Sequence, residues 1–228
     1  MFKLFLFDID GTLIRTGGAG VKAFELTFSS VFGIADATAT LKFAGRTDTS
    51  LVREGFLLHG IEPTGENFDR FFERYPVLLE KLLHELPGGP CEGVQDFLQC
   101  IQQANPSPAI GLLTGNIRRG AELKLKRFGL WDHFPFGGFA DDNEIRDCIA
   151  GVAKQRGEHA VGKSLKGDEI VVIGDTPLDI ACGKSIGAKV LAVGTGNYTL
   201  DELAVFKPDW AVENLERIDP RELGLSHG

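Results

Sequence analysis

Cysteine, positive charge and long hydrophobic runs are all scarce in this chain. Its four cysteines are scattered, with no CxxC pair and no histidine cluster beside them, so neither a disulfide framework nor a zinc site is expected. No apolar run approaches the roughly 20 residues that a membrane span requires. The N-terminus reaches Asp8 and Asp10 too early for a signal peptide. These absences predict a reduced, cytoplasmic protein that makes no membrane contact.

The shortage of positive charge excludes one class of partner. The chain has 24 Lys and Arg residues against 32 Asp and Glu residues, a net charge of −8, which opposes binding to nucleic acid through net charge. Its 228 residues are 43% hydrophobic, enough to bury a core, and the length fits one large domain or a core with a smaller insert. We expect a globular monomer or homodimer.

Short apolar runs alternate with helical segments in the C-terminal two-thirds of the chain. The runs are rich in Val, Ile, Leu and Phe, and each stops at a small or polar residue, as strands buried on both faces do. This alternation predicts an α/β fold with a doubly wound parallel sheet. The expected strands cover residues 3–7, 109–113, 170–173 and 189–193, and the expected helices cover residues 117–128, 143–156 and 177–186.

The segment between the first two expected strands has a different pattern. It contains amphipathic helices over residues 21–32, 48–58 and 66–86, and Pro76 should kink the last one or start a new helix. Glycine-rich stretches at residues 16–20 and 86–94 flank this segment and resemble hinges. The sequence therefore predicts an α/β core of residues 1–15 and 88–228, with a helical cap of residues 16–87.

The strongest chemical signal is FDIDGTL, in which Asp8 and Asp10 follow the first expected strand. Ligands of open α/β sheets bind just beyond the carboxyl ends of the strands. Two nearby carboxylates raise each other's pKa, and a divalent cation removes that repulsion by taking carboxylate oxygens as ligands. The alternative is an ordinary polar turn that caps a helix.

A second signal is LLTGN, which ends another apolar run at Thr114, Gly115 and Asn116. If Thr114 opens a helix, its hydroxyl and the following N–H groups form an anion site at the helix N-terminus. Thr and Asn are also common N-caps, so capping alone would explain them.

The third signal is VVIGDTPLDI, in which Asp175 ends an apolar run and Asp179 follows four residues later. Asp179 could orient metal ligands or water from behind the site. It could equally be an acidic residue that favours the helix dipole.

In this order, the three motifs resemble those of the haloacid dehalogenase superfamily of phosphohydrolases, and the layout is similar to its phosphoglycolate phosphatase and β-phosphoglucomutase group. The resemblance implies a Rossmann-like core with a helical cap. It also implies that Asp8 is the nucleophile that forms an aspartyl-phosphate and that Asp10 is the general acid and then the base. Mg²⁺ would be held by Asp8, Asp175 and the backbone carbonyl of Asp10. Thr114, Gly115 and Asn116 would bind the phosphoryl group.

One expected residue is out of place. The family carries a Lys or Arg before the acidic motif, where this chain has Asp142 or Asn143. Arg146 is the nearest positive residue and ranks first as the cation that binds the nucleophile and the phosphate. Lys154, Lys163 and Lys166 lie further along the chain and are also open.

The cap contains one candidate for substrate recognition. In FAGRTD, Arg46 stands in a Gly-Arg turn just before an expected helix, and the resemblance makes it a hook for an anionic group of the substrate. The alternative is a capping turn in which Arg46 points to solvent.

Four functions remain open at this stage. A Mg²⁺-dependent hydrolase of a small phosphorylated metabolite fits best, and a phosphomutase would use the same residues. A dehalogenase needs no metal, and Asp10 counts against it because that branch of the superfamily lacks the second aspartate. A phosphate-binding module without turnover is favoured only by the displaced cation.

Overall fold

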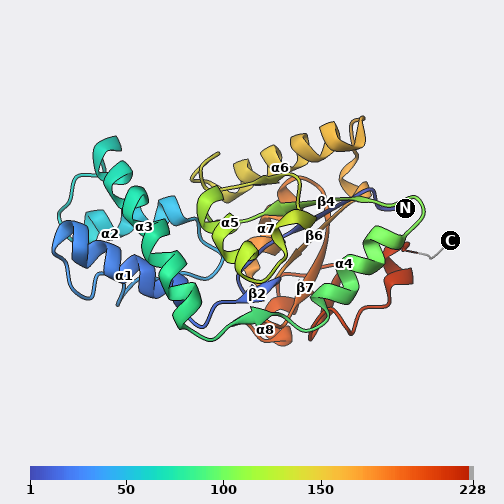
Figure 1. Ribbon diagram of the computed structural model, residues 1–228. Helices are drawn as coiled ribbons and strands as arrows, with labels where there is room; N and C mark the ends of the chain where they lie inside the picture. Colours follow the sequence, from blue (N-terminus) through green and yellow to red (C-terminus); the bar gives the residue numbers. More distant parts are fainter. Residues whose placement is uncertain (226–228) are drawn as a thin grey trace.

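A computed structural model describes residues 1–225, and its centre is a six-stranded sheet in the order β5-β4-β1-β6-β7-β8 (Figure 1). All neighbouring strands in it are parallel. From β1 the chain builds β4 and β5 on one side and then crosses to β6, β7 and β8 on the other, so the strand order reverses beside β1. The strands are β1 (Leu4–Phe7), β4 (Ala109–Leu113), β5 (Gly137–Gly138), β6 (Ile170–Gly174), β7 (Lys189–Val193) and β8 (Trp210–Val212).

Helices cover both faces of this sheet, as the alternating pattern predicts. Phe5 and Phe7 of β1 pack with residues of α4 (Val94–Gln103) and α5 (Arg118–Arg127). Leu4 and Leu6 point to the other face and pack with α6 (Arg146–Val161) and α7 (Pro177–Ser185), because successive side chains of a strand alternate between faces. The remaining short elements of the core are α8 (Leu200–Ala204), η1 (Trp131–His133), η2 (Gly167–Glu169) and η3 (Pro220–Leu223).

Three helices form a separate lobe, drawn in blue to green at one end of Figure 1. They are α1 (Ala19–Phe32), α2 (Asp48–Leu58) and α3 (Gly65–Glu85), and they share a phenylalanine-rich hydrophobic cluster that also includes Ile117, Leu123 and Ala140 of the core. The helix α3 runs unbroken through Pro76, so no new helix starts there. Buried Phe71, Tyr75 and Leu79 lie on both sides of the proline, and this packing sustains the helix, since tertiary contacts supply most helical stability.

The two connections between the lobe and the core run side by side. Ile14–Arg15 (β2) pairs antiparallel with Gly89–Pro90 (β3), and a Cβ at Gly17 would overlap the carbonyl oxygen of Pro87. The lobe also rests on the core through contacts between α3 and α5. This arrangement supports the proposed division into a core and a cap of residues 16–87.

Most expected elements appear within a few residues of their expected bounds. The sequence missed α4, β5 and β8, and β5 consists only of two glycines, which give no strand signal. The thiols of Cys91 and Cys182 are buried, whereas Cys148 is exposed. Within the described part of the chain, no helix combines the length and apolar character needed to cross a bilayer.

Candidate active site

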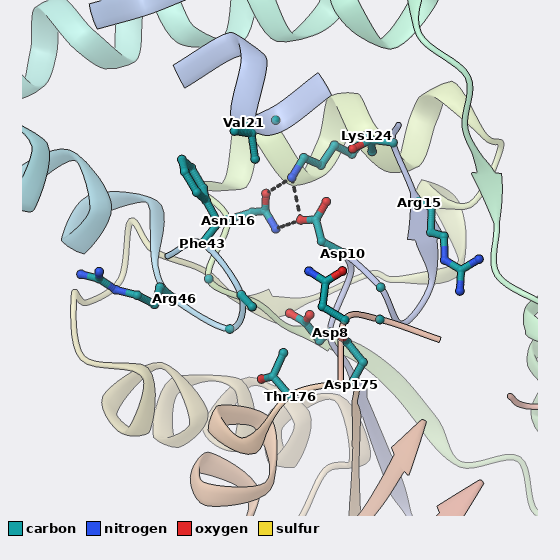
Figure 2. A pocket seen from close by; sticks show the side chains of 18 of the residues that line it. Asp8, Asp10, Arg15, Val21, Phe43, Arg46, Asn116, Lys124, Asp175 and Thr176 are labelled. Atoms are coloured by element: carbon teal, nitrogen blue, oxygen red, sulfur yellow. Dashed lines mark hydrogen bonds and ion pairs between the residues drawn. The ribbon is translucent and has the colours of Figure 1, made fainter. Parts of the chain in front are cut away.

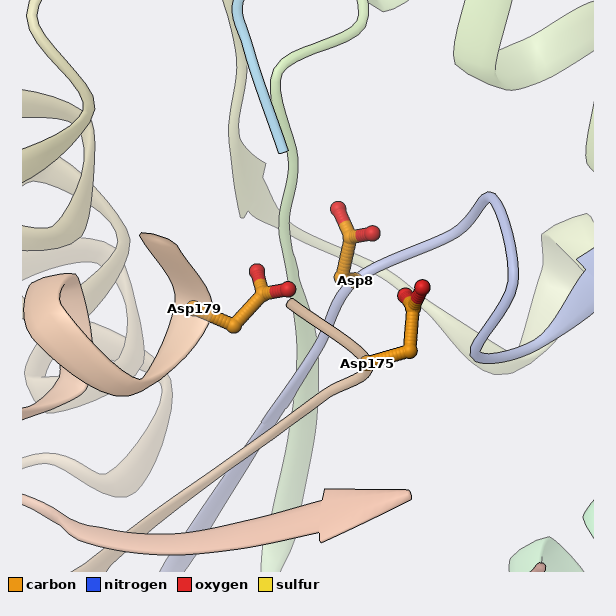
Figure 3. A group of neighbouring side chains, drawn as sticks. All are labelled: Asp8, Asp175 and Asp179. Carbon is orange, nitrogen blue, oxygen red and sulfur yellow. The ribbon is translucent and has the colours of Figure 1, made fainter. Parts of the chain in front are cut away.

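Three buried carboxylates meet at the carboxyl edge of the sheet (Figure 3). Asp8 follows β1, Asp175 follows β6, and Asp179 stands in the first turn of α7. The adjacent strands are in register through Phe7 and Ile173, so Asp8, one residue further on, and Asp175, two residues further on, leave the sheet at the same edge. One oxygen from each of the three acids lies within 4.8 Å of the others. The structure thus brings Asp8 and Asp175 together, as the motifs predict.

Glycines make room for Asp175. Its Oδ1 accepts a hydrogen bond of 2.9 Å from Thr12 Oγ1. Gly11 has φ 86°, and a Cβ there would lie 2.5 Å from Asp175 Oδ2. A Cβ at Gly196 would overlap the same oxygen, so the loops around this carboxylate tolerate no side chain at either position.

Burial makes the ionised form of these acids costly. It raises the pKa of Asp8 to about 7, with Asp179 adding to the shift and Arg146 opposing it. It raises the pKa of Asp175 to about 8, with a further contribution from Asp179 and Asp8. Clustered carboxylate oxygens of this kind are the ligands that Mg²⁺ prefers, and a bound cation would hold both groups ionised. The donor set therefore fits a divalent metal.

Asp179 differs from the other two acids because its oxygens are already engaged. Oδ2 accepts hydrogen bonds from the N–H of Thr176 (3.0 Å) and from its hydroxyl (2.7 Å), which forms the capping box of α7. Oδ1 is bound by the guanidinium of Arg146. Asp179 thus caps a helix and also stands beside the acid pair, and its role in orienting metal ligands or water stays a prediction.

Arg146 is the cation that the structure places beside Asp8. Its Nη2 donates to Asp8 Oδ1 at 3.0 Å and to Asp179, and its Nη1 donates to the carbonyl of Gly45 at 2.9 Å. The side chain is 8% exposed, and its Nε has no hydrogen-bond partner among residues 1–225. Of the four candidates, Arg146 alone stands in the first turn of α6, where that helix starts above the sheet edge.

The other candidate cations lie elsewhere. Lys154 is further along α6, away from its first turn. Lys163 lies 4.0 Å from Glu169, which pairs with Lys3 just before β1. Lys163 and Lys166 are therefore near the amino ends of β1 and β6, at the opposite edge of the sheet.

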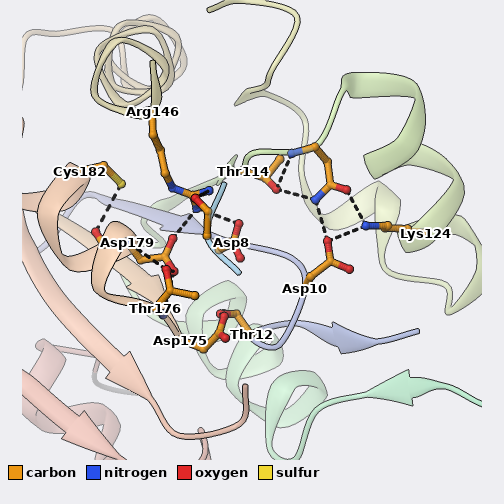
Figure 4. A network of polar contacts seen from close by, with 12 residues as sticks. Asp8, Asp10, Thr12, Thr114, Lys124, Arg146, Asp175, Thr176, Asp179 and Cys182 are labelled. Carbon is orange, nitrogen blue, oxygen red and sulfur yellow. Dashed lines mark hydrogen bonds and ion pairs between the residues drawn. The ribbon is translucent and has the colours of Figure 1, made fainter. Parts of the chain in front are cut away.

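Asp10 belongs to a second polar cluster (Figure 4). Its Oδ2 accepts hydrogen bonds from Lys124 Nζ (2.6 Å) and from Asn116 Nδ2 (2.8 Å). Lys124 Nζ also donates to Asn116 Oδ1 at 2.6 Å. The Lys124 side chain is 5% exposed, whereas that of Asp10 is 43% exposed.

Lys124 was absent from the sequence prediction. It stands in the last turn of α5, beside the basic residues Lys126 and Arg127. Its spacing is the missed signal, because Lys124 follows buried Ala121 by three residues and precedes buried Leu125. A lysine on the buried face of a helix requires a partner, and here the partner is Asp10.

The LLTGN segment does not open a helix at Thr114. The helix α5 begins at Arg118, and the N–H of Ile117 donates to Asp48 Oδ2 at 2.8 Å. The N–H of Arg118 donates to Asp141. The expectation of an anion site at this helix N-terminus is therefore wrong, because carboxylates from other loops already occupy its donors.

The three residues of that segment nevertheless lie next to the acids. Thr114 is fully buried, and its hydroxyl accepts a 2.9 Å hydrogen bond from Asn116 Nδ2. Gly115 and Asn116 line a cavity. The roles of all three in phosphate binding remain proposals.

A cavity of about 420 Å³ separates the acids from the cap. Its lining includes Asp8, Asp10 and Asp175 from the core, and Val21 and Phe43 from the cap (Figure 2). Such a volume suits a small molecule.

Arg46 lies at the edge of this cavity. Its guanidinium pairs with Glu54 and lies 3.4 Å from the Ser50 hydroxyl, and its side chain points away from Asp8 (Figure 2). The predicted contact with substrate would require this guanidinium to leave Glu54, so the hook remains a prediction.

The cap is held against the core by backbone contacts. The N–H of Asp48 donates to the carbonyl of Gly115 at 2.7 Å, and Arg146 binds the carbonyl of Gly45. A Cβ at Gly115 would overlap the carbonyl oxygen of Arg46. The loop before α2 thus lies directly on the catalytic loops, and the cavity is covered.

The sheet is Rossmann-like, aspartates cluster at its switch point, and a helical cap lies above them. Together these features define a class of capped hydrolases. The model of the family described as haloacid dehalogenase-like hydrolase matches residues 5–193. The chain belongs to this family of hydrolases, as the sequence motifs predict.

Individual relatives agree with this assignment. The chain is 28% identical over 222 residues to the pyrophosphatase PpaX of Halalkalibacterium halodurans, which covers 92% of each chain. Two solved structures share the fold over nearly the whole chain. A predicted phosphoglycolate phosphatase from Haemophilus somnus has a TM-score of 0.72 at 18% identity, with 98% of each chain covered. A putative β-phosphoglucomutase from Thermotoga maritima has a TM-score of 0.65 at 18% identity, with 99% of this chain and 100% of that chain covered.

Proposed function

We propose that this protein is a Mg²⁺-dependent phosphatase that hydrolyses a small phosphomonoester through an aspartyl-phosphate intermediate. One observation carries the proposal: Asp8 and Asp175 meet at the sheet edge, with Arg146 bound to Asp8 and a covered cavity in front of them. That combination supplies a nucleophile, a metal site and a phosphate-binding cation at one point.

Asp8 and Asp10 divide the chemistry between them. A carboxylate oxygen of Asp8 attacks phosphorus, and the bond to the ester oxygen breaks. Asp10 gives its proton to the leaving alcohol and then takes a proton from the water that hydrolyses the aspartyl-phosphate. Lys124 and Asn116 hold Asp10 by Oδ2, while Oδ1 accepts no hydrogen bond from any described residue. Oδ1 is therefore the oxygen available for proton transfer.

Asp8, Asp175 and the backbone carbonyl of Asp10 would hold the magnesium ion. When bound, Mg²⁺ would offset the negative charge that phosphoryl oxygens carry in the transition state. Arg146 would bind another phosphoryl oxygen from the first turn of α6. Thr114, Gly115 and Asn116 would help to position the phosphoryl group.

Pyrophosphate is a second candidate substrate. It is favoured by the relatives in Halalkalibacterium halodurans and Clostridium perfringens that carry the name pyrophosphatase PpaX. The same nucleophile, acid and metal site would serve to cleave a phosphoanhydride bond.

The experiment that tests this function compares the wild-type chain with Asp8→Asn on phenyl phosphate, with Mg²⁺ and with EDTA. We expect turnover with Mg²⁺ only, and none above background for the variant, with an unchanged far-UV circular dichroism spectrum. A variant that retains activity would exclude the covalent mechanism. Activity that survives EDTA would exclude the metal.

A further inference from the structure

A buried tyrosine on the cap side of the cavity has an unused hydroxyl. Tyr75 of α3 is 1% exposed and lines the cavity. Across residues 1–225, its hydroxyl makes no hydrogen bond. The hydroxyl of a buried tyrosine normally finds a partner, so this one is available to a ligand.

Two charged groups in the same lining also have hydrogen-bonding capacity to spare. Asp48 receives the N–H of Ile117 at Oδ2, and its Oδ1 accepts no hydrogen bond within the described chain. Lys124 donates to Asp10 and to Asn116, which leaves one of the three N–H bonds of its ammonium group unused. Both residues line the cavity.

These groups lie close to one another. Burial raises the pKa of Tyr75 well above its usual range, and the charges of Asp48 and Asp10 add to the shift. A Cβ at Gly120, one turn before Lys124 on α5, would lie 3.5 Å from Tyr75 Cε1, so the ring lies against the helix that carries Lys124. Apolar side chains of the cap, Val21 and Phe43 among them, lie on the same side of the cavity and cover the Asn116–Lys124 pair (Figure 2).

The charges around Tyr75, Asp48 and Lys124, at the cap side of the cavity, disfavour an anionic leaving group. Lys124 is already paired with Asp10, and Arg46 with Glu54. The guanidinium of Arg15 donates to the carbonyl of Thr195 and points away from Asp10 (Figure 2).

Asp48 adds a further acidic group to this end. A second phosphate or a carboxylate on the leaving group would therefore lie near two acids here, while Lys124 and Arg46 are already paired and Arg15 is bound to the carbonyl of Thr195.

We propose that Tyr75, Asp48 and Lys124 bind hydroxyl groups of the leaving alcohol, so that the substrate is the phosphomonoester of a small uncharged polyol or sugar. Asp48 accepts a hydroxyl hydrogen, Lys124 donates to a hydroxyl oxygen, and Tyr75 can do either. The apolar wall packs against the carbon skeleton. This inference rests on the proposed phosphatase function and names its substrate class.

The test measures kcat/KM with Mg²⁺ for four substrates and for phenyl phosphate. Glycerol 1-phosphate and propyl phosphate have the same carbon chain with and without hydroxyl groups, and pyrophosphate and phosphoglycolate carry an anionic leaving group. We expect glycerol 1-phosphate to exceed the other three by at least about tenfold, because a site built around hydroxyl groups rejects analogues that lack them.

The matched variants are Tyr75→Phe and Tyr198→Phe. The first keeps the buried ring and removes only the hydroxyl, and we expect it to lower the preference for glycerol 1-phosphate over propyl phosphate about fivefold, mainly through KM. Tyr198 packs against the cluster of β7, α7 and α8, so its variant should keep the wild-type preference. Equal melting temperatures would confirm that both variants fold.

Each outcome is decisive. Equal rates for glycerol 1-phosphate and propyl phosphate, faster cleavage of pyrophosphate or phosphoglycolate, or an unchanged preference in Tyr75→Phe would overturn the subsite and leave the phosphatase function standing. Failure to hydrolyse any substrate, phenyl phosphate included, would overturn the phosphatase function and this inference together.

Discussion

Removal of the Arg146 guanidinium tests how the buried acids are held. Arg146→Ala deletes the contacts to Asp8 and Asp179 and the link to the cap at Gly45. Asp179 is fully buried and Asp8 is 6% exposed, so neither carboxylate can recover its hydration. Breaking a buried ion pair from one side costs about 3–5 kcal/mol. For a chain of this length, 1 kcal/mol corresponds to roughly 2–4 °C in melting temperature.

We therefore expect the metal-free Arg146→Ala variant to melt about 6–20 °C below the wild type at pH 8. The loss should shrink at pH 5.5, because carboxyls with a raised folded-state pKa are protonated there and no longer need the cation. Turnover of phenyl phosphate should fall about 10²–10³-fold, the usual cost of losing one group that stabilises transition-state charge.

Differential scanning fluorimetry in EDTA at the two pH values measures the first effect, and steady-state kinetics with Mg²⁺ measures the second. Arg146→Lys should recover only part of the lost stability and part of the lost activity, since one ammonium cannot replace a guanidinium with three partners. Lys154→Ala, on the same helix, is the control and should behave as the wild type. An Arg146→Ala variant that melts within 2 °C of the wild type at pH 8 and keeps a third of its activity would refute the reasoning.

Three further changes have expected outcomes. Gly196→Ala places a methyl group on Asp175 Oδ2, so the Mg²⁺ concentration for half-maximal activity should rise at least about tenfold; an unchanged magnesium titration would contradict this. The rise in melting temperature on adding Mg²⁺ should be larger at pH 8 than at pH 5.5. The folded-state pKa values of Asp8 and Asp175 are about 7 and 8, and both exceed the unfolded value of about 3.9. The metal-free protein therefore loses stability over this range, and equal melting shifts at both pH values would count against a carboxylate metal site. Lys124→Met should lower kcat about 10–100-fold with a smaller change in KM, because the ammonium holds the proposed acid–base group. The control Lys126→Met, at an exposed position, should leave kcat unchanged. Equal effects of the two substitutions would remove Lys124 from the site.

Residues at strand ends were predictable because parallel strands align their carboxyl termini. Each acidic motif follows a run of buried apolar residues, so recognising the strand also places the acid at one edge of the sheet. Asp8 and Asp175 met this condition, and the register between β1 and β6 completed it. Arg146 was ranked first by its nearness to the expected position of the cation, and the first turn of α6 brings its side chain to Asp8.

The contacts between cap and core could not be read in the same way. Asp48 of the cap accepts the N–H of Ile117, at the start of α5, across 69 residues of chain. This separation is bridged by the docking of α3 on α5, for which no local sequence pattern gives an angle. The pair of Lys124 and Asp10 lies within the core, and its separation of 114 residues likewise leaves no local signal. The pairing of Arg46 with Glu54, eight residues on along the cap, likewise turned a predicted substrate contact into an ion pair inside the cap.

The order of apolar runs and acidic motifs by itself determined the fold class, the helical insert and the two aspartates that meet at the sheet edge, because local periodicity and strand ends are properties of neighbouring residues. The tertiary structure alone decided the orientation of Arg46, the partners of Lys124 and the polar groups left open toward the cavity. Those features depend on how the cap helices and α5 pack on one another and on the sheet. Such a placement results from the summed packing of many side chains, and no single motif encodes it.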